Sequence, residues 1–226
     1  MSIRKLISSG TPSLDEALGG GLDAGEILHI FGPGGVGKTT LALQFTINAA
    51  RKGNRVFYVN LEGKFPLVRL KQMASTEFNK ISPLITIVSP TSFQEQATVV
   101  SNLDSLLSSD VRLLVFDTIV SHYRKEHGPN TDNVMLNRKL NQQFGLFASI
   151  ARSSSLSVIV VNQVRADIND ELHFIPVAES VVSYWGTYSI QINRAESKGY
   201  REFKLTKGKE SEPKILVMSL ESSGFR

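Results

Sequence analysis

The sequence contains no cysteine, so it can form neither a disulfide nor a thiolate metal site, and it offers no cysteine nucleophile. No apolar run comes near the roughly 18–20 residues that are needed to span a bilayer. The first residues, MSIRKLISSG, lack the apolar stretch of a secretion signal. Together these absences predict a cytoplasmic protein with no membrane partner.

The overall composition is that of an ordinary globular protein. The 226 residues carry 25 Lys and Arg against 21 Asp and Glu, and 41% of them are hydrophobic, which argues against wholesale disorder. Single cores commonly extend over about 200–250 residues, and we find no internal repeat, low-complexity tract or linker. We therefore expect one domain spanning residues 1–226. The net charge of +4 permits a polyanionic partner but does not require one.

Apolar runs rich in β-branched residues recur along the chain, and segments with helical periodicity separate most of them. The expected strands cover residues 26–32, 55–61, 84–88, 111–117 and 158–162, and the expected helices cover residues 39–51, 66–78, 93–107 and 131–152. Successive residues of a strand point to opposite faces of the sheet, and in these strands both faces are apolar. This is typical of parallel sheets that helices cover on both faces. This alternation predicts an α/β fold with a mainly parallel, twisted sheet, flanking helices and right-handed crossovers.

The pattern changes after residue 162. Residues 165–179 resemble a long connection, and three segments that alternate like strands follow at 187–193, 202–206 and 214–220. Gly199 and the Lys207-Gly-Lys209 segment supply turn signals between them. We therefore expect an antiparallel meander that extends the sheet at its C-terminal end.

A phosphate-binding motif is the strongest signal in the sequence. The segment from Gly32 to Thr39 reads GPGGVGKT and fits G-x-x-x-x-G-K-[ST] at every fixed position, directly after an expected strand and at the start of an expected helix. Glycines let backbone N–H groups approach phosphates closely, and the helix N-terminus adds positive charge. Lys38 would neutralise the β- and γ-phosphates, and the Thr39 hydroxyl would bind Mg²⁺. The predicted nucleotide-binding residues are Gly32, Pro33, Gly34, Gly35, Val36, Gly37, Lys38, Thr39 and Thr40.

Three polar residues stand at the carboxyl ends of expected strands, the edge where open α/β sheets bind nucleotides. Asp117 ends an apolar strand and is the candidate Mg²⁺ ligand beside Thr39, acting through water. Glu62 could orient or deprotonate an attacking water. The amide of Gln163 could sense a γ-phosphate without adding negative charge. For Glu62 and Gln163, a solvated strand end is an equally good interpretation of the sequence alone.

The motifs, taken in order, resemble the RecA/RadA recombinase superfamily, and within it the short archaeal paralogues of the RadB family. The resemblance covers nearly the whole chain. It is carried by the opening SGTPSLD at 9–15, the phosphate loop, LEG at 61–63, LVFD at 114–117, HYR at 122–124, NRKL at 137–140 and VNQV at 161–164. It implies a RecA-like P-loop ATPase core that binds ATP and Mg²⁺.

The resemblance also assigns roles to single residues. It implies that Glu62 activates water, that Arg69 packs on the adenine face through its planar guanidinium, and that Gln163 couples the nucleotide to a DNA-binding loop. Lys207 and Lys209 fall where related ATPases place a basic pair that reaches the γ-phosphate of a neighbouring subunit. Two solvated hairpin lysines are an equally good interpretation of that pair.

Two loops would contact DNA in this family. The first offers Arg124, Lys125, Arg138 and Lys139 as phosphate contacts, and the second offers Arg165. The second loop is unfavourable on charge, because it sets Arg165 against Asp167, Asp170, Glu171 and Glu179. Residues 194–214 form another basic segment, which also suits an edge hairpin protected against aggregation.

The predicted function is that of an accessory protein of DNA repair and homologous recombination. Only about ten residues precede the core, so we expect no separate N-terminal DNA-binding domain and no strand exchange by this chain itself. We expect ATP and DNA binding, weak ATP hydrolysis, a possible homo-oligomer and a RadA-type recombinase or other recombination protein as partner. The alternatives are a KaiC-like signalling ATPase and a nucleotide-gated protein-interaction module.

Overall fold

A mainly parallel sheet organises the part of the chain that the computed structural model describes, residues 6–128, 132–166, 174–208 and 213–226. Nine strands lie in the order β11-β10-β9-β8-β1-β5-β4-β2-β3, and the pairs from β8 to β3 are parallel. The strands are β1 Ile27–Phe31, β2 Arg55–Asn60, β3 Ile85–Val88, β4 Val111–Asp117, β5 Ser157–Val161, β8 Tyr188–Arg194, β9 Tyr200–Lys207, β10 Lys214–Glu221 and β11 Gly224–Phe225. Strands β8 to β11 pair antiparallel, so the predicted parallel core and C-terminal meander are both confirmed.

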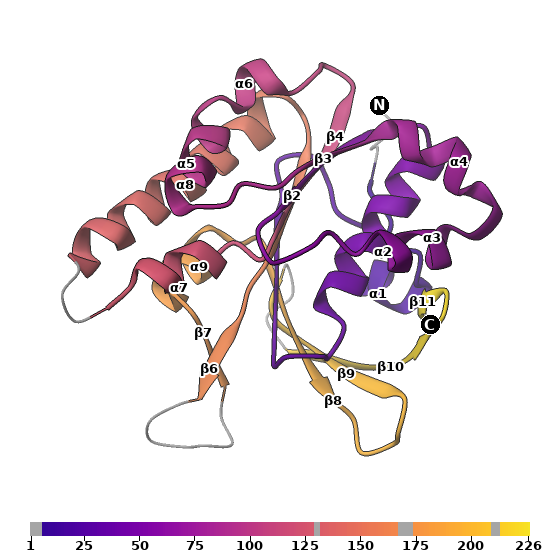
Figure 1. Cartoon of the computed structure of the whole chain (residues 1–226). Helices are drawn as coiled ribbons and strands as arrows, with labels where there is room; N and C mark the ends of the chain where they lie inside the picture. The colour runs from indigo at the N-terminus through magenta and orange to yellow at the C-terminus, as the bar shows by residue number, and fades with distance from the viewer. Residues whose placement is uncertain (1–5, 129–131, 167–173, 209–212) are drawn as a thin grey trace.

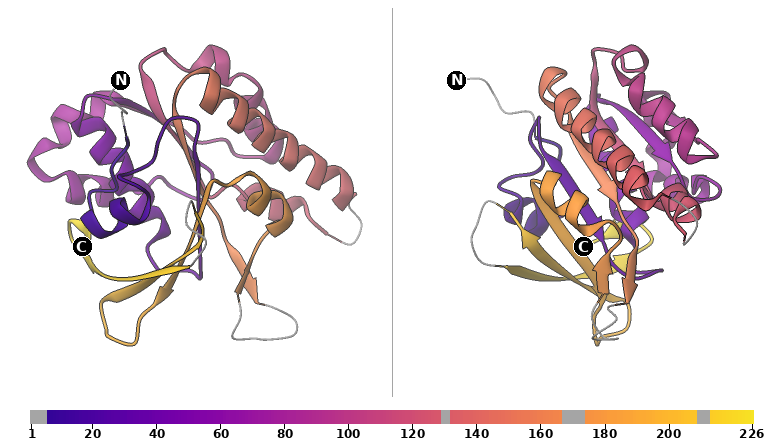
Figure 2. Two further views of the ribbon diagram at one scale, coloured as in Figure 1. Left: turned by 180° about the vertical axis from the view of Figure 1, so that it is seen from behind. Right: turned by 90° about the vertical axis from the view of Figure 1, so that its left-hand side faces the viewer.

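Helices cover both faces of the sheet (Figures 1 and 2). One face carries α1 Pro12–Ala17, α2 Lys38–Arg51, α3 Leu67–Ala74 and α4 Phe78–Ile81. The other carries α5 Phe93–Ser101, α6 Leu103–Leu106, α7 Ser121–Glu126, α8 Asn133–Ser153 and α9 Glu179–Trp185. No helix in the described ranges is long and apolar enough to cross a membrane.

Two hydrophobic cores lie on opposite sides of the central strands. On β4, Leu113 and Val115 pack toward α2, whereas Leu114 and Phe116 pack toward α8. The ring of Phe116 stacks on Phe147 of α8 with centroids 4.2 Å apart. Because the central strands are buried on both faces, their sequences are apolar without alternation.

Two expected helices are shorter than their patterns indicated. The expected helix over residues 66–78 ends at Ala74, and 3₁₀ turns at Ser75–Glu77 and Ser82–Leu84 flank the short helix α4. The expected helix over residues 93–107 breaks at Asn102, whose side-chain amide donates to the Thr98 carbonyl. Such local side-chain bonds compete with the helical backbone pattern. The expected helix over residues 131–152 is confirmed as α8, which Asp132 caps by accepting from the Met135 N–H.

The segment that was expected to be a plain connection contains regular structure. β6 Val164–Ala166 and β7 Phe174–Pro176 form a two-stranded antiparallel sheet, and α9 follows. At the end of α9, the Trp185 indole N–H donates to Asn141 of α8 at 2.8 Å, and its ring meets Tyr184 edge-on. Helix α9 thereby anchors the strand pair to α8.

The last residues of the chain pack onto α2. Gln44 accepts a hydrogen bond from the Phe225 N–H at 2.8 Å and donates to the Phe225 carbonyl and the Thr11 hydroxyl. The Phe225 ring meets Phe203 of β9 edge-on, with centroids 4.8 Å apart. A Cβ on Gly37 would come within 2.6 Å of the Phe225 ring. Strand β11 therefore fits closely against the first turn of α2, next to the phosphate-binding motif.

One buried histidine makes stability depend on pH. His29 on β1 is 1% exposed, stacks on Phe31 with centroids 4.9 Å apart, and has no hydrogen-bond partner for Nε2 among the described residues. Burial lowers its pKa from 6.5 to about 3. Below pH 6.5 the unfolded chain binds a proton at His29 that the folded protein does not bind. The free energy of unfolding therefore decreases as the pH is lowered from 6.5 to 3.

This linkage predicts a loss of about 2 kcal/mol between pH 7.5 and 5, because one pKa unit corresponds to roughly 1.4 kcal/mol and the folded protein takes up little of the proton in this range. We expect urea unfolding at pH 7.5 and 5.0 to show a larger loss for the wild type than for His29→Leu, by about that amount. The variant serves as the control, since all other titrating groups are common to both proteins. Equal losses in the two proteins would show that His29 carries no such linkage.

Candidate nucleotide site

The phosphate loop lies between β1 and α2, and Gly32 and Gly37 in it adopt conformations that other residues rarely take. Gly32 has φ 148°, and a Cβ there would come within 2.1 Å of the Ile192 carbonyl oxygen on the neighbouring strand β8. Gly37 has φ 104° in the left-handed region and immediately precedes α2. The loop therefore turns tightly enough for the N-terminus of a 14-residue helix to face the space above it.

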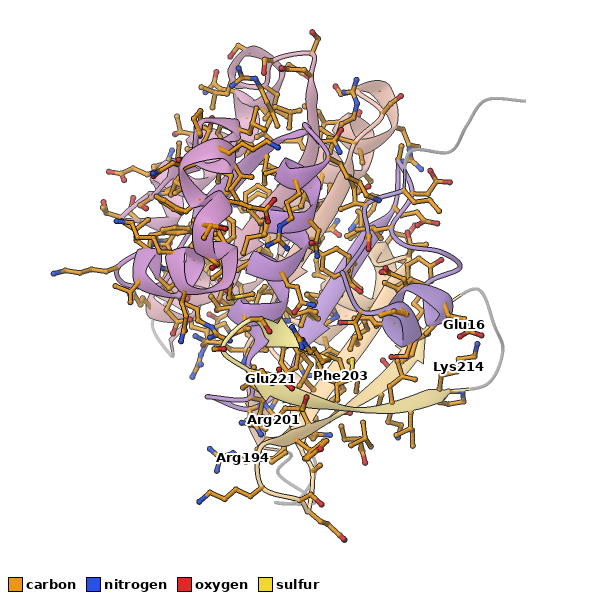
Figure 3. All side chains as sticks on the ribbon, turned by 90° about the vertical axis from the view of Figure 1, so that its right-hand side faces the viewer. Glu16, Arg194, Arg201, Phe203, Lys214 and Glu221 are labelled. Carbon is orange, nitrogen blue, oxygen red and sulfur yellow. The ribbon has the colours of Figure 1, made fainter. Side chains whose placement is uncertain are left out.

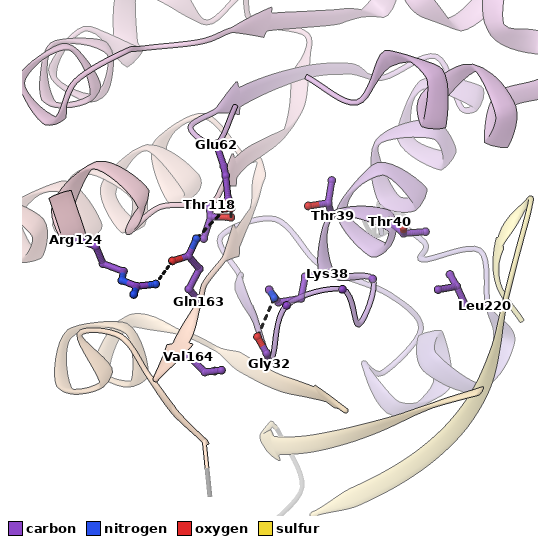
Figure 4. A pocket seen from close by; sticks show the side chains of 13 residues that line it. Gly32, Lys38, Thr39, Thr40, Glu62, Thr118, Arg124, Gln163, Val164 and Leu220 are labelled. Carbon is purple, nitrogen blue, oxygen red and sulfur yellow. Dashed lines mark hydrogen bonds between the residues drawn. The ribbon is translucent and has the colours of Figure 1, made fainter. Parts of the chain in front are cut away.

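Lys38 spans this loop. Its ammonium donates to the carbonyl of Gly32 at 2.8 Å (Figure 4) and to that of Pro33, also at 2.8 Å. Burial lowers the pKa of Lys38, and the carboxylates of Asp117 and Glu62 oppose that shift. Because an ammonium has three donors, one N–H remains for a ligand in the loop.

Asp117 lies at the end of β4, 3% exposed, on the side of the loop that holds Thr39. Its carboxylate accepts hydrogen bonds from the Tyr58 hydroxyl at 2.6 Å, from Thr118 at 3.1 Å and from Thr39. Burial raises the pKa of Asp117, and these three donors counteract the shift. Burial also raises the pKa of Tyr58, so that residue stays a donor.

The oxygens of Thr39 and Asp117 fit a magnesium site. No cluster of three or more His, Cys, Asp or Glu side chains in the described ranges could hold a metal ion by itself. Mg²⁺ does not need one, because it takes one or two protein oxygens and completes its shell with phosphates and water. Binding of the ion by Thr39 and Asp117 stays a prediction.

Glu62 is held by two neighbours. Its Oε1 accepts a hydrogen bond from the Gln163 amide at 3.1 Å, and its Oε2 lies 2.9 Å from the Thr118 hydroxyl, whose single proton it shares with Asp117. Gln163 in turn accepts a hydrogen bond from the Arg124 guanidinium (Figure 4). The structure thus brings both candidate catalytic residues together, from the ends of two different strands.

These groups surround a pocket of about 540 Å³. Its lining includes Gly32, Gly34, Gly35, Gly37, Lys38, Thr39, Thr40, Glu62, Thr118, Arg124, Gln163, Val164 and Leu220. Pro33 and Val36 belong to the same loop, with Val36 buried in the core. Sequence reasoning missed Tyr58, Thr118 and Leu220. Thr118 could have been predicted from the sequence, because it directly follows Asp117, the candidate magnesium ligand.

Arg69 lies outside the lining of this pocket. From α3, its guanidinium donates to the backbone carbonyls of Glu221 and Ser222 at 2.7 and 2.9 Å. It also donates to the Gln72 side chain. The residue therefore holds the turn that follows β10, and Leu220 just before that turn lines the pocket. Contact of Arg69 with an adenine ring stays a prediction.

Two arginines on the β8–β9 hairpin lie beside the phosphate loop. Arg194 and Arg201 are directly opposite each other in the strand pairing and project from the same end of the molecule (Figure 3). The Arg201 guanidinium donates to the Val36 carbonyl at 3.2 Å. A Cβ on Gly35 would come within 3.7 Å of the Arg194 guanidinium. The basic segment seen in the sequence thus supports the loop from outside.

The candidate DNA contacts divide into two groups. Lys125 on α7 and Arg138 and Lys139 on α8 are exposed. Arg124 and Arg165 line a second pocket of about 600 Å³, which lies between α7, α8 and the start of α9. Of the five acidic or basic residues proposed for the second loop, Asp167, Asp170 and Glu171 lie outside the described residues.

The candidate subunit-bridging lysines are only partly described. Lys207 is exposed and donates to the Ser183 carbonyl of its own α9 at 2.8 Å. Lys209 lies outside the described residues. Action of either lysine on a neighbouring subunit stays a prediction.

Comparisons with known proteins agree with this geometry. A family model described as Rad51 matches residues 3–207. The DNA repair and recombination protein RadB of Methanosphaera stadtmanae is 32% identical over 204 residues, covering 89% of this chain and 87% of that protein. The protein of the same name from Thermococcus kodakarensis is 36% identical over 199 residues, covering 87% of each.

A solved structure extends the match to three dimensions. The crystal structure of the RadB recombinase superposes with a TM-score of 0.81 at 31% identity, covering 97% of this chain and 98% of that one. The resemblance that the motifs indicated is thereby confirmed over almost the full length of both proteins. This chain belongs to the Rad51 family, within its RadB branch.

Proposed function

We propose that this protein binds ATP with Mg²⁺ and binds DNA, as a cytoplasmic accessory protein of DNA repair and homologous recombination. The observation that carries the proposal is the convergence of Lys38, Asp117 and the Glu62–Gln163 pair on one side of the phosphate loop. The relatives named DNA repair and recombination protein RadB support the process. They favour it over a KaiC-like signalling ATPase or a protein-interaction module.

Each residue of the site would have a separate role in ATP hydrolysis. Lys38 and the loop amides would hold the phosphates, and Glu62 would orient or deprotonate the attacking water. When bound between Thr39 and Asp117, Mg²⁺ would neutralise charge on the phosphates. Gln163 would sense the γ-phosphate from the strand end that leads into β6.

We propose that hydrolysis is weak. The Gln163 amide donates to Glu62 and the Thr118 hydroxyl contacts it, so an attacking water has to share the carboxylate with these two groups. Lys207 donates a hydrogen bond to a carbonyl of its own chain. It would have to give up that bond before it could reach the phosphates of a nucleotide bound to a neighbouring subunit. We further propose that the protein does not itself drive strand exchange and acts beside a RadA-type recombinase, in the process for which its relatives are named.

Single-stranded DNA binding should weaken linearly in log salt. The five candidate contacts, Arg124, Lys125, Arg138, Lys139 and Arg165, give a slope of at most about −3.5, since each phosphate contact contributes roughly −0.7 for single strands. Removing Arg138 and Lys139 together should reduce the slope by about 1.4. Fluorescence anisotropy with an oligothymidine, in the presence of a non-hydrolysable ATP analogue, measures both slopes.

A matched variant controls for net charge. Lys52→Ala with Lys80→Ala removes the same charge from exposed positions after α2 and on α4, and its slope should equal that of the wild type. Absence of binding by the wild type at low salt would contradict the DNA-binding proposal and favour the protein-interaction module. Stable hexamers formed with ATP alone, detected by light scattering, would favour the KaiC-like alternative.

A further inference from the structure

Tyr58 on β2 places a hydroxyl group in the hydrophobic core beside α2. The side chain is fully buried, and its ring meets Phe65 edge-on, with centroids 5.2 Å apart. Phenylalanine would fill the same space, and burying a hydroxyl costs free energy unless the group forms a hydrogen bond. The hydroxyl has such a partner in Asp117, to whose Oδ2 it donates at 2.6 Å.

The pairing of two strands brings these residues together. Tyr58 lies directly opposite Val115 of β4, and Asp117 is two residues further along that strand. Val115 packs in the core beside α2, and residues two apart on a strand point to the same face. A long side chain reaches such a diagonal neighbour. The Asp117 carboxylate is therefore contacted by Tyr58 from the sheet and by Thr39 from the first turn of α2.

The contacts of Asp117 restrict how its carboxylate can turn. Oδ2 accepts from Tyr58, and Oδ1 lies 3.1 Å from the Thr118 hydroxyl. The Thr118 hydroxyl also contacts Glu62, whereas in the described ranges the Tyr58 hydroxyl donates to Asp117 alone. A carboxylate oxygen that accepts one hydrogen bond keeps a lone pair for another donor. The carboxylate can thus be held by Tyr58 and still accept from Thr39 or from water.

We propose that Tyr58 is a positioning residue for magnesium, whose hydroxyl holds the Asp117 carboxylate in the orientation that accepts from the water shell of a nucleotide-bound Mg²⁺ ion. The inference rests on the proposed function and adds to it a residue that determines the affinity for the metal. Removing the hydrogen-bond partner of a metal-binding group typically lowers metal affinity by about 10–100-fold.

A magnesium titration tests this role without relying on hydrolysis. Binding of a fluorescent, non-hydrolysable ATP analogue, followed as Mg²⁺ is added, gives the half-saturating Mg²⁺ concentration. Tyr58→Phe keeps the ring against Phe65 and removes the donor, so it should raise that concentration by about tenfold or more. Affinity for the analogue in EDTA should stay within about twofold of the wild type, because Tyr58 does not line the nucleotide pocket.

Tyr188→Phe is the matched control. Tyr188 is 1% exposed, and its hydroxyl donates to the Leu18 carbonyl at 3.0 Å, away from the lining of the nucleotide pocket. Both substitutions remove a buried hydroxyl and should lower the urea midpoint of unfolding, but Tyr188→Phe should leave the half-saturating Mg²⁺ concentration within about twofold. In an Asp117→Ala background, Tyr58→Phe should no longer change that concentration, because the hydroxyl has no carboxylate to position.

Three results would overturn the inference: an unchanged half-saturating Mg²⁺ concentration in Tyr58→Phe, an equal rise in Tyr188→Phe, or the same effect of Tyr58→Phe in the Asp117→Ala background. Each would leave binding of the analogue, and with it the proposed function, intact. A wild type that does not bind the analogue, or whose binding does not respond to Mg²⁺, would instead overturn the proposed ATP–Mg²⁺ site and the inference with it.

Discussion

Replacing Lys38 with alanine should weaken the binding of Mg²⁺–ATP by about 100-fold or more, since hydrogen bonds to charged groups are worth roughly 1.5–3 kcal/mol each. The loss has two sources. The phosphates lose a cation, and the carbonyls of Gly32 and Pro33 lose the donor that ties the loop together. The carboxylates of Asp117 and Glu62 would then face the phosphates without the charge that offsets them. Isothermal titration calorimetry measures the affinity.

Lys64→Ala is the matched control for this substitution. Lys64 is exposed in the segment between β2 and α3, so its removal lowers the net charge equally and should leave the affinity within about twofold. Thermal unfolding of both variants should show a folded protein. An affinity of Lys38→Ala within threefold of the wild type would mean that the loop does not hold a triphosphate.

Replacing Glu62 with glutamine should lower the rate of ATP hydrolysis by about 100-fold or more, the usual contribution of a general base. Glutamine keeps the size of the side chain and can still accept a hydrogen bond from Thr118, which Glu62 now accepts at 2.9 Å. Nucleotide affinity should therefore stay within about twofold of the wild type. Single-turnover hydrolysis separates this chemical step from binding.

Glu77→Gln is the control, because Glu77 forms an exposed ion pair with Arg51, away from the pocket. It removes one carboxylate and should hydrolyse ATP at the wild-type rate. If Glu62→Gln also did so, another group would position the water. Thr118 and Gln163 are the nearest candidates, since both contact Glu62.

The parallel core and the phosphate loop could be predicted because their signals are local. Strands β4 and β5 contain the apolar runs Leu113–Phe116 and Val158–Val161, and the loop sequence contains every fixed position of its motif. Asp117, Glu62 and Gln163 could be placed at one edge because the carboxyl ends of parallel strands meet there. Sequence position was sufficient for these residues.

The remaining features depend on contacts between distant parts of the chain. Strand β11 has only two residues, and its position is fixed by Gln44, 181 positions earlier in the sequence. Arg124 was expected to contact DNA, and its bond to Gln163 joins residues 39 positions apart. No pattern within one segment could reveal these two contacts. The break at Asn102 is different, because it involves a local bond to the Thr98 carbonyl that hydrophobic periodicity does not register.

Trp185 gives the molecule a natural optical probe. It is the single tryptophan of the chain, and it joins α9 to α8 directly after the strand pair β6–β7. Indole emission depends on the surroundings of the ring, so a rearrangement of this region should change the wavelength or intensity of the fluorescence without any attached dye. Stopped-flow mixing with nucleotide or oligonucleotide could then follow the movement of this region in real time on the unmodified protein.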